Sequence, residues 1–457
     1  MAHKKYALVL GGGGTKGIYE FGVWTALREL NIELEAVIGT SIGAINGMWI
    51  VQGDYEEAKR IWDTISLGDV LKIPQNFSYP PTTGPNSLQT LSLLSKILFR
   101  QGSLDSSPLK ALIRAQVNPD KLRKSRLDFG IITLDVTRMK PREFFMDDLD
   151  QIHLADYLAA SAAFPGFKET KFNGRKYMDG GLYDNVPYRT ALKRGYRNII
   201  VVNVSGLGIH HTMDTQGTQT VFIKNSIEMG HVLEFDRVFL NAFRHLGYLD
   251  TLRTFGKLEG HWYFLHKNEG FYSSWNDILT NRDFFDTLKS LIPPEVWHKP
   301  PREALRSLFP KEASLERNPS RLLMESAALA LRLERIETYT PKELKTQIVA
   351  RYQALQKQVD SVDPLPYQNF FKALLQEMKA PLVTQMINDK AAIELDMLLG
   401  HLKLRTHHPH LMGTLFGFFP YLKAAKVFIR LLVWEHRHRG PLALLSSDPL
   451  VQYNEED

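Results

Sequence analysis

The 457-residue chain contains no cysteine. This absence excludes disulfide bonds, thiolate nucleophiles and cysteine-ligated metals, and it suits a protein in a reducing compartment. Long apolar runs are missing as well, since no run of apolar residues reaches the roughly 18 residues of a membrane-spanning helix. Before the first glycines only residues 6–10 form an apolar run, whereas the core of a signal peptide needs about 7–15 apolar residues. We therefore expect a cytoplasmic protein.

Charge of one sign is also scarce, because 56 basic residues face 50 acidic ones and leave a net charge of +6. Such a surface can approach anionic lipid headgroups or nucleic acid. No nucleic-acid-binding motif accompanies it, so we expect no nucleic-acid partner. The clustered histidines His401, His407, His408 and His410 lack i,i+4 pairing and carboxylate neighbours, and no standard metal-ligand spacing appears. We expect neither a metal nor a cofactor.

What the sequence does contain is a Gly-x-Ser-x-Gly pentapeptide between two apolar runs, at 34–38 and 42–51. This order predicts a strand, a sharp turn and a helix, which is the arrangement of a nucleophile elbow. Gly39 and Gly43 would leave room for the tight turn. Ser41 would stand exposed at a helix N-terminus, where free N–H groups and the helix dipole favour developing negative charge. Ser41 is therefore the candidate nucleophile.

A second glycine-rich turn lies upstream, where residues 11–14 follow the apolar run 6–10 and precede a helical pattern. Consecutive glycine N–H groups between a strand and a helix form an anion-binding nest, which beside a serine nucleophile is a candidate oxyanion hole. A structural turn and a nucleotide-phosphate loop would also fit this pattern. The dinucleotide fingerprint needs an acidic residue at the end of the second strand, but Glu33 and Glu35 stand at its start, and Gly39, Thr40 and Ser41 stand at its end. A Walker loop fails because Thr15 separates the last glycine from the lysine.

A third segment, residues 177–187, carries a candidate catalytic carboxylate, Asp179, followed by Gly180 and Gly181. An Asp-Gly pair alone is a common hairpin turn. Just before it, residues 159–167 form a run of small residues that ends in a Pro-Gly turn. Such a run is suited to close packing beside a site, so we interpret Asp179 as part of one.

Together these segments resemble the patatin-like phospholipase family. The resemblance is carried, in chain order, by residues 12–17, 39–43, 161–166 and 179–181, within a similar region of about 5–205 and a weaker continuation at 247–252. Lys16 stands where arginine is commoner in the family. The lysine keeps the positive charge but loses the planar guanidinium fork.

The resemblance implies a serine lipid acyl hydrolase of the phospholipase A or lysophospholipase type. Asp179 would act directly on Ser41 as the base, without a histidine, and the reaction would pass through an acyl-enzyme. The implied oxyanion hole consists of the backbone amides of Gly12, Gly13, Gly14 and Ile42. The supporting motif residues are Lys16, Gly17, Gly39, Gly43, Gly180 and Gly181. The expected partner is a lipid substrate, with peripheral membrane contact as a further expectation.

Three alternatives to this mechanism and function stay open. The first is an α/β-hydrolase triad, which would need a histidine after Asp179, and the candidates are His210, His211, His231, His245, His261 and His266. Against a triad, only one predicted strand precedes the elbow strand, and none of these histidines lies in a motif. The second is an acyltransferase on the same nucleophile, and the third is a non-catalytic lipid-binding member.

Alternating strands and helices over the first 205 residues predict an α/β domain with three α/β/α layers and a mostly parallel sheet. Six prolines between residues 293 and 320 predict a linker. Beyond it the pattern is helical, with a capping box at Thr340 followed by Pro341. We expect a patatin-like acyl hydrolase domain at 1–292, a Pro-rich linker at 293–320, and an all-helical C-terminal region of unknown role at 321–457.

Two segments are candidates for contact with lipid. Residues 88–99 follow a loop at 76–86 and predict an apolar helix, which would be either a mobile lid or a helix packed on the core. Residues 421–437 place Lys423, Lys426 and Arg430 on one helical face. This pattern fits a membrane-surface helix or, as we favour, a core helix with a solvated stripe.

Overall fold

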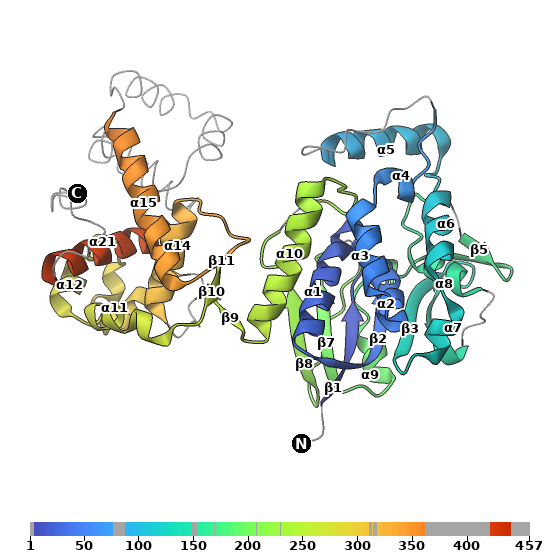
Figure 1. Ribbon diagram of the computed structural model, residues 1–457, viewed down its shortest axis with the longest axis horizontal. Coiled ribbons are helices and arrows are strands. Elements are labelled where there is room, and N and C mark those ends of the chain that lie inside the picture. The colour runs from blue at the N-terminus through green and yellow to red at the C-terminus, as the bar shows by residue number, and fades with distance from the viewer. Residues whose placement is uncertain are drawn as a thin grey trace. The chain divides into compact units, whose positions relative to one another are not determined.

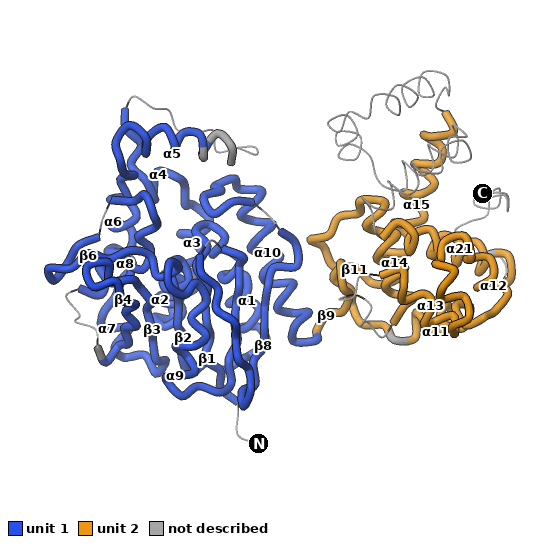
Figure 2. The backbone as a smooth tube through the Cα atoms, turned by 180° about the vertical axis from the view of Figure 1, so that it is seen from behind, with its two compact units in different colours: residues 1–256 blue, residues 257–457 orange. Residues whose placement is uncertain are grey.

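The structure is a computed structural model that describes residues 4–75, 87–148, 153–168, 170–206, 208–228, 230–309, 313, 318–361 and 421–439. The expected loop at 76–86 and the histidine cluster at 401–410 therefore lie outside the described residues. The chain divides into two compact units, residues 1–256 and 257–457 (Figures 1 and 2). The domain boundaries expected at residues 292 and 320 remain predictions.

Unit 1 is built on a sheet of eight strands among the described residues. These strands are β1 (Lys5–Leu10), β2 (Glu33–Thr40), β3 (Asp128–Asp135), β4 (Lys140–Phe145), β5 (Thr170–Phe172), β6 (Arg175–Asp179), β7 (Asn198–Asn203) and β8 (Gln219–Lys224). Strands β3, β2, β1, β7 and β8 lie side by side in that order and run parallel, and β4, β5 and β6 add antiparallel pairs at the β3 end. The predicted mostly parallel sheet is thus confirmed.

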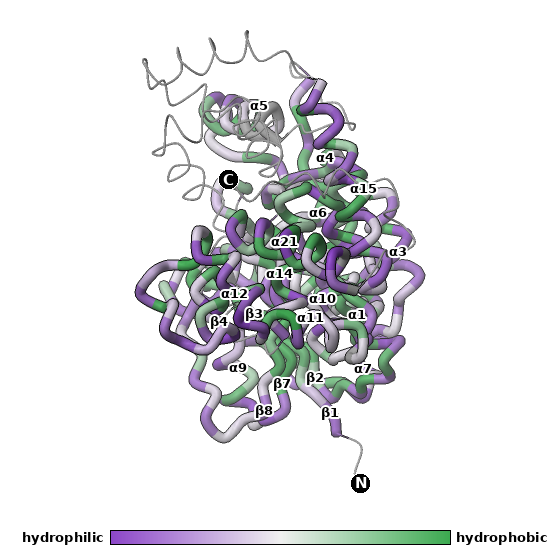
Figure 3. The backbone as a smooth tube through the Cα atoms, turned by 90° about the vertical axis from the view of Figure 1, so that its left-hand side faces the viewer, coloured by the Kyte–Doolittle hydropathy of each residue, from purple (hydrophilic) through white to green (hydrophobic). Residues whose placement is uncertain are grey.

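Helices cover both faces of this sheet (Figure 1). They are α1 (Ile18–Glu29), α2 (Ile42–Gln52), α3 (Tyr55–Thr64), α4 (Leu67–Val70), α5 (Ser87–Gln101), α6 (Ser107–Gln116), α7 (Pro119–Lys124), α8 (Leu154–Ser161), α9 (Tyr188–Lys193) and α10 (Arg237–Thr254). Val9 of β1 shares a buried cluster with Tyr188 and Ala191 of α9, so its neighbours Leu8 and Leu10 point to the opposite face. Strands covered on both faces are apolar in their buried part. Residues 36–38 of β2 and 199–202 of β7 are apolar and buried, and the strands labelled β2 and β7 are largely green in Figure 3. This is the predicted three-layer α/β/α arrangement.

Strand pairing around β3 determines where the site forms. β4 pairs with β3 along residues 130–135, so β2 and β6 must share the other edge of β3. On that edge Thr40 pairs with Ile132, and Asp179 pairs with the next residue, Thr133. β2 runs parallel to β3 and β6 runs antiparallel, so the carboxyl ends of β2 and β6 meet head-on. The turn after Thr40 and the carboxylate of Asp179 are therefore held at adjacent positions of one strand.

The helix α5 packs by one side and exposes the other. Leu94 and Ile97 are buried in a cluster with Leu67 and other apolar side chains near α4. At its C-terminal end, Leu98 is 38% exposed and Phe99 is 93% exposed. The helix therefore combines a packed face with an unusually exposed apolar end. Within the described part of the chain, no helix has both the length and the apolar character needed to cross a bilayer.

Unit 2 is mainly helical, and it includes the C-terminal region that the sequence predicted to be helical from residue 321 onward. Its helices are α11 (Ser273–Ile278), α12 (Arg282–Asp286), α13 (Pro301–Leu305), α14 (Pro319–Ala330), α15 (Pro341–Asp360) and α21 (Leu422–Arg439). Strands β9 (Leu258–Glu259), β10 (Phe264–His266) and β11 (Thr338–Tyr339) add a small sheet that the sequence did not predict. The capping box is confirmed, because Thr340 Oγ1 accepts from Glu343 N–H at 3.2 Å and the Glu343 carboxylate accepts from Thr340 N–H at 2.7 Å.

The proline-rich segment and α21 both contribute to the core of unit 2. Leu305 of α13 is buried in the same cluster as Val427 and Phe428 of α21. On α21, Arg430 donates hydrogen bonds to the backbone oxygen of Thr287 and to Ser290 Oγ. α21 thus packs like a core helix, and its contact with a membrane remains a prediction.

Candidate active site

Ser41 occupies the sharp turn between β2 and α2. Its backbone dihedrals are φ 55° and ψ −123°. Residues other than glycine adopt such a conformation only at a cost of about 1–3 kcal/mol. The flanking glycines permit the turn: a Cβ on Gly39 would lie 2.3 Å from the backbone of Gly43, and a Cβ on Gly43 would lie 2.5 Å from the carbonyl oxygen of Leu10. The strand, sharp turn and helix predicted from the pentapeptide are present, but Ser41 is buried, at 9% exposure, where the sequence predicted an exposed side chain.

The backbone of Ser41 is anchored to the sheet by Ser161, the last residue of α8. Ser41 N–H donates to Ser161 Oγ at 2.8 Å, and Ser161 Oγ donates to the carbonyl oxygen of Ile132 at 2.6 Å. The sequence singled out the small residues around Ser161 for close packing but did not predict this hydrogen-bonded link. The sequence contained a hint of this link, because Ser161 is a lone hydroxyl residue among alanines and a hydroxyl can donate and accept a hydrogen bond at the same time.

The carboxylate of Asp179 faces the hydroxyl of Ser41. Ser41 Oγ donates to Asp179 Oδ2 at 2.7 Å, and Gly181 N–H donates to Asp179 Oδ1 at 2.8 Å. Burial raises the pKa of Asp179 to about 6, although these two hydrogen bonds act in the opposite direction. Gly180 leaves the turn room, since a Cβ there would lie 2.3 Å from the carbonyl oxygen of Ile132. The carboxylate is therefore held by one oxygen and directed at the serine by the other.

The glycine nest lies against the same serine. Gly12 N–H donates to the carbonyl oxygen of Asn185 at 3.0 Å, so this amide is already engaged. Within the described residues, the amides of Gly13, Gly14 and Ile42 donate to no protein acceptor. These three N–H groups are the ones available to a negatively charged oxygen near Ser41.

The supporting motif residues tie the nest to the elbow. A Cβ on Gly17 would lie 2.3 Å from Ile42 Cγ1, so the turn and α2 pack in direct contact. Lys16 N–H donates to the carbonyl oxygen of Gly13 at 3.2 Å. Its ammonium group is partly buried, which lowers the pKa of Lys16, and its side chain does not line the pocket that Ser41 lines. Lys16 therefore supports the nest through its backbone.

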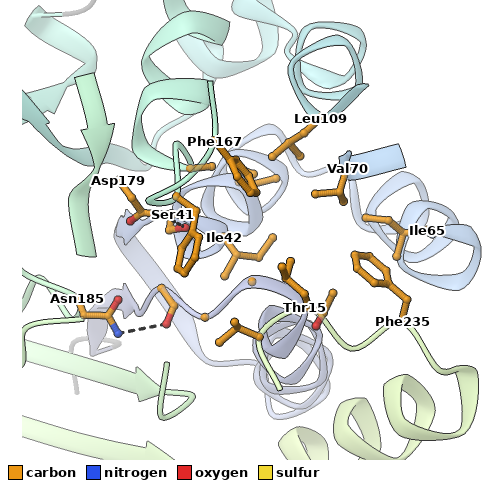
Figure 4. A pocket seen from close by; sticks show the side chains of 18 of the residues that line it. Thr15, Ser41, Ile42, Ile65, Val70, Leu109, Phe167, Asp179, Asn185 and Phe235 are labelled. Atoms are coloured by element: carbon orange, nitrogen blue, oxygen red, sulfur yellow. Dashed lines mark hydrogen bonds between the residues drawn. The ribbon is translucent and has the colours of Figure 1, made fainter. Parts of the chain in front are cut away.

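A largely apolar pocket opens above the serine (Figure 4). It encloses about 760 Å³, counting the part open to solvent. Its polar lining includes Thr15, Ser41, Asp179 and Asn185. Its apolar lining consists of Ile42, Ile45, Trp62, Ile65, Val70, Leu109, Ala162, Phe164, Phe167, Val232, Leu233 and Phe235. An apolar cavity with a few convergent polar groups is the usual form of a ligand site.

The six candidate histidines do not line this pocket. His211, for example, is hydrogen-bonded through Nε2 to the carbonyl oxygen of Tyr183 at 3.0 Å. His261 and His266 belong to unit 2. Among the described residues, no three His, Cys, Asp or Glu side chains are grouped so that they could hold a metal ion.

The segment that carries this geometry matches a known family. Residues 8–192 match the family model described as patatin-like phospholipase. This part of the chain is a patatin-like phospholipase domain. The matched segment contains the elbow, the nest, Ser161, Asp179 and Asn185.

The curated relatives of the patatin-like domain are much longer proteins. Lysophospholipase NTE1 of Candida albicans is 26% identical over 228 residues, which cover 49% of this chain and 15% of that protein. Patatin-like phospholipase domain-containing protein 6 of Homo sapiens is 28% identical over 203 residues, covering 43% of this chain and 13% of that protein. The chain thus spans less than a sixth of either relative. The crystal structure of VipD from Legionella pneumophila aligns over 98% of this chain and 93% of its own, at 15% identity and a TM-score of 0.31.

One wall of the pocket in the patatin-like domain comes from outside the sequence motifs. The segment before α10 crosses the nest: Thr15 N–H donates to the carbonyl oxygen of Val232 at 2.9 Å, and Glu234 N–H donates to Thr15 Oγ1 at 3.0 Å. This contact brings Leu233 and Phe235 into the lining. The sequence did not predict this wall, because residues 219 positions apart carry no local signal of their pairing.

Proposed function

We propose that this chain is a serine acyl hydrolase for lipid esters, of the phospholipase A or lysophospholipase type. The observation that carries the proposal is the 2.7 Å hydrogen bond from Ser41 Oγ to Asp179 Oδ2 at the wall of an apolar pocket. A serine hydroxyl is a weak nucleophile without a base, and Asp179 is the base within reach of its proton. The match to the patatin-like family and the lysophospholipase relatives support the substrate class.

In the first half of the reaction, Asp179 takes the proton of Ser41 while Oγ attacks the ester carbonyl carbon. The carbonyl electron pair moves onto the oxygen, and under this proposal the N–H groups of Gly13, Gly14 and Ile42 stabilise the negative charge. The tetrahedral intermediate then collapses and breaks the bond to the alcohol oxygen. Asp179 returns the proton to this leaving alcohol, and the acyl group stays on Ser41 as an ester.

In the second half, water replaces the alcohol. Asp179 removes a proton from water as its oxygen attacks the acyl carbonyl, and the same amides hold the second oxyanion. Collapse releases the fatty acid, and Ser41 recovers its proton from Asp179. A carboxylate with a pKa of about 6 is ionised at neutral pH and is more basic than an exposed aspartate, as a general base requires.

The pocket supports a long acyl chain as the bound group. Its lining beyond Ser41 is formed by aromatic and aliphatic side chains of α2, α3, α6 and the segment before α10. Removing an acyl chain from water there contributes about 0.8 kcal/mol for each methylene group. Under this proposal the enzyme works from the cytoplasm and meets its lipid by peripheral contact with a membrane.

Labelling with a fluorophosphonate probe and a lipid panel would test the proposal. The wild type should become labelled and release fatty acid, detected by mass spectrometry. Ser41→Ala should abolish both signals, and Asp179→Asn should slow turnover by about 100- to 10,000-fold, as loss of a general base does. Ser361→Ala, an exposed serine at the end of α15, is the matched control.

Two results would redirect the proposal. Labelling that survives Ser41→Ala would put the nucleophile elsewhere. If alanine at one of the six histidines were as damaging as Asp179→Asn in a folded protein, a triad would replace the dyad. Adding acyl acceptors such as lysolipids to the same assay separates hydrolysis from acyl transfer, because transfer yields a new ester instead of fatty acid.

A further inference from the structure

Asn185 holds Gly12 of the nest by two hydrogen bonds. Gly12 N–H donates to the carbonyl oxygen of Asn185 at 3.0 Å. In return, Asn185 Nδ2 donates to the carbonyl oxygen of Gly12 at 3.2 Å, as the dashed line in Figure 4 marks. Asn185 is itself fixed, since it is 1% exposed and its N–H donates to the carbonyl oxygen of Ile209 at 2.9 Å.

The Gly12 carbonyl is also confined from a second side, by Gly206. A Cβ on Gly206 would lie only 1.9 Å from that oxygen and 2.8 Å from the Cα of Gly13. The backbone at residue 206 therefore packs directly on the Gly12–Gly13 peptide. The side-chain amide of Asn185 donates a hydrogen bond to the Gly12 carbonyl, and Gly206 packs closely against it. Together these two contacts fix the direction of this carbonyl group.

The orientation of one peptide group fixes its N–H as well as its C=O. A trans peptide is planar, and its C=O and N–H point in opposite directions. With the Gly12 carbonyl held by Asn185, the N–H of Gly13 must point away from Asn185. This N–H has no protein acceptor among the described residues, and Gly13 lines the pocket beside Ser41.

We propose that Asn185 is a positioning residue that orients the Gly13 N–H as a donor to the reaction's oxyanion. The inference rests on the proposed acyl hydrolase function and assigns Asn185 a role in it. The need for such a residue follows from the glycines: a Gly-Gly peptide has little steric resistance to rotation. A rotated peptide would present the Gly12 carbonyl oxygen, in place of an N–H, to the negative charge.

The test compares an ester with the thionoester of the same short, soluble acid. Sulfur in place of the carbonyl oxygen is larger and accepts hydrogen bonds poorly, so a well-formed oxyanion hole should favour the ester strongly. Asn185→Asp keeps the size of the side chain but cannot donate to the Gly12 carbonyl, and Asn185→Ser is too short to reach it. Both keep the backbone carbonyl that accepts from Gly12 N–H.

We expect both variants to lower kcat for the ester by about 100- to 1,000-fold, as loss of one oxyanion donor does, with KM changed only a few-fold. The ratio of ester to thionoester turnover should fall by a similar factor, which a purely structural role would not cause. Asn225→Asp is the matched control. This buried asparagine also donates through Nδ2 to a backbone carbonyl, at 3.0 Å from Ile227, and does not line the pocket.

Several outcomes would overturn the inference. Loss of turnover with an unchanged ester-to-thionoester ratio, or with a raised KM alone, would make Asn185 a folding or binding residue. Unchanged kcat in both variants, with melting temperatures near that of the wild type, would show that the Gly12–Gly13 peptide needs no such support. Failure of the wild type to turn over either substrate would overturn the proposed function itself and the inference with it.

Discussion

At the scale of single residues, Ser41 combines the proposed role of nucleophile with backbone strain. Its positive φ of 55° is maintained by contacts on every side: the flanking glycines, the Ser161 link and the pairing of Thr40 with β3. These contacts hold the Ser41 hydroxyl beside the Asp179 carboxylate. The strained backbone of Ser41 lowers the stability of the folded chain in return.

This strain predicts a difference between two variants that both lack the hydroxyl. Ser41→Gly should be more stable than Ser41→Ala by about 1 kcal/mol, because glycine adopts positive φ without a Cβ clash. Urea denaturation of both variants would measure the difference. At the nearby position Thr64, which ends α3, the order should reverse, since alanine is the better helix former. An alanine variant at residue 41 as stable as the glycine variant would mean that the turn is not strained.

The pKa of Asp179 predicts the acid limb of the activity profile. Burial raises this pKa to about 6, and only the ionised carboxylate can accept the proton of Ser41. kcat/KM should therefore be constant above about pH 7 and fall roughly tenfold per pH unit below about pH 6. Rates on a soluble ester between about pH 4.5 and 8 would measure this limb.

Asp184 offers a matched control for the pH profile. Burial also raises the pKa of Asp184 to about 6, but this residue does not line the pocket. Asp184→Asn should leave the midpoint of the acid limb where it is. A midpoint that disappears in Asp184→Asn would assign the titration to Asp184, and the acid limb would then no longer support Asp179 as the base.

At the scale of elements, the exposed end of α5 is the best candidate for contact with a lipid surface. Leu98 lies 3.6 Å from the position of a Cβ on Gly166, next to Phe164 and Phe167, which line the pocket. The C-terminal end of α5, which carries the exposed Phe99, therefore lies against a segment that contributes to the pocket wall. Inserting such a side chain into a membrane contributes about 1.5–3 kcal/mol.

Phe99→Glu should accordingly lower hydrolysis of phospholipid vesicles by about 10- to 100-fold, and it should leave hydrolysis of a short soluble ester unchanged. Met139→Glu is the matched control, since Met139 is an apolar side chain with 73% exposure in the turn between β3 and β4. Parallel assays on vesicles and on the soluble ester measure both effects. Equal losses on the two substrates would mean that α5 only stabilises the fold.

The sequence predicted those helices and strands whose residue pattern is evident within the segment itself. The largely apolar segments at 6–10, 34–38, 129–134 and 198–204 predicted the central parallel strands β1, β2, β3 and β7 to within one or two residues at either end. β5 and β6 have polar side chains and are three and five residues long, so their pairing with β3 depends on tertiary contacts that no local pattern announces. The small sheet of unit 2 was missed for the same reason, because two of its strands have two residues each.

The residues of the candidate site also differ in whether a local sequence pattern could predict them. Ser41 and Asp179 were identified because their turns require glycines at fixed offsets. The roles of Ser161 and Asn185 rest on hydrogen bonds to residues 120 and 173 positions away. The sequence also could not predict that the Gly12 N–H is already hydrogen-bonded, because its acceptor, the carbonyl oxygen of Asn185, lies 173 positions away.

At the scale of the whole molecule, every residue that lines the pocket precedes residue 256, where unit 1 ends. The helix α10 closes this unit at Thr254, and unit 2 has a buried cluster of its own. The chemistry proposed for the dyad thus needs side chains from unit 1 alone.

A chain that stops after Gly256 should therefore hydrolyse a soluble ester with a kcat within about tenfold of the full chain. Circular dichroism would establish that this shortened chain is folded, and the same chain with Ser41→Ala would give the background rate. A folded but inactive product would mean that unit 2 takes part in forming the site.

Because the ends of β2 and β6 meet on β3, the order in which the chain is made bears on when it becomes reactive. Ser41 and Asp179 are 138 residues apart, and contacts of such long range form only after a large loss of chain entropy. A nascent chain carries its serine, its glycine nest and β3 well before the aspartate has been synthesised. Until β6 pairs with β3, the Ser41 hydroxyl lacks its hydrogen bond to Asp179, which is the base in the proposed mechanism. Under the proposed mechanism, a nascent chain could therefore not hydrolyse lipid before β6 has paired with β3.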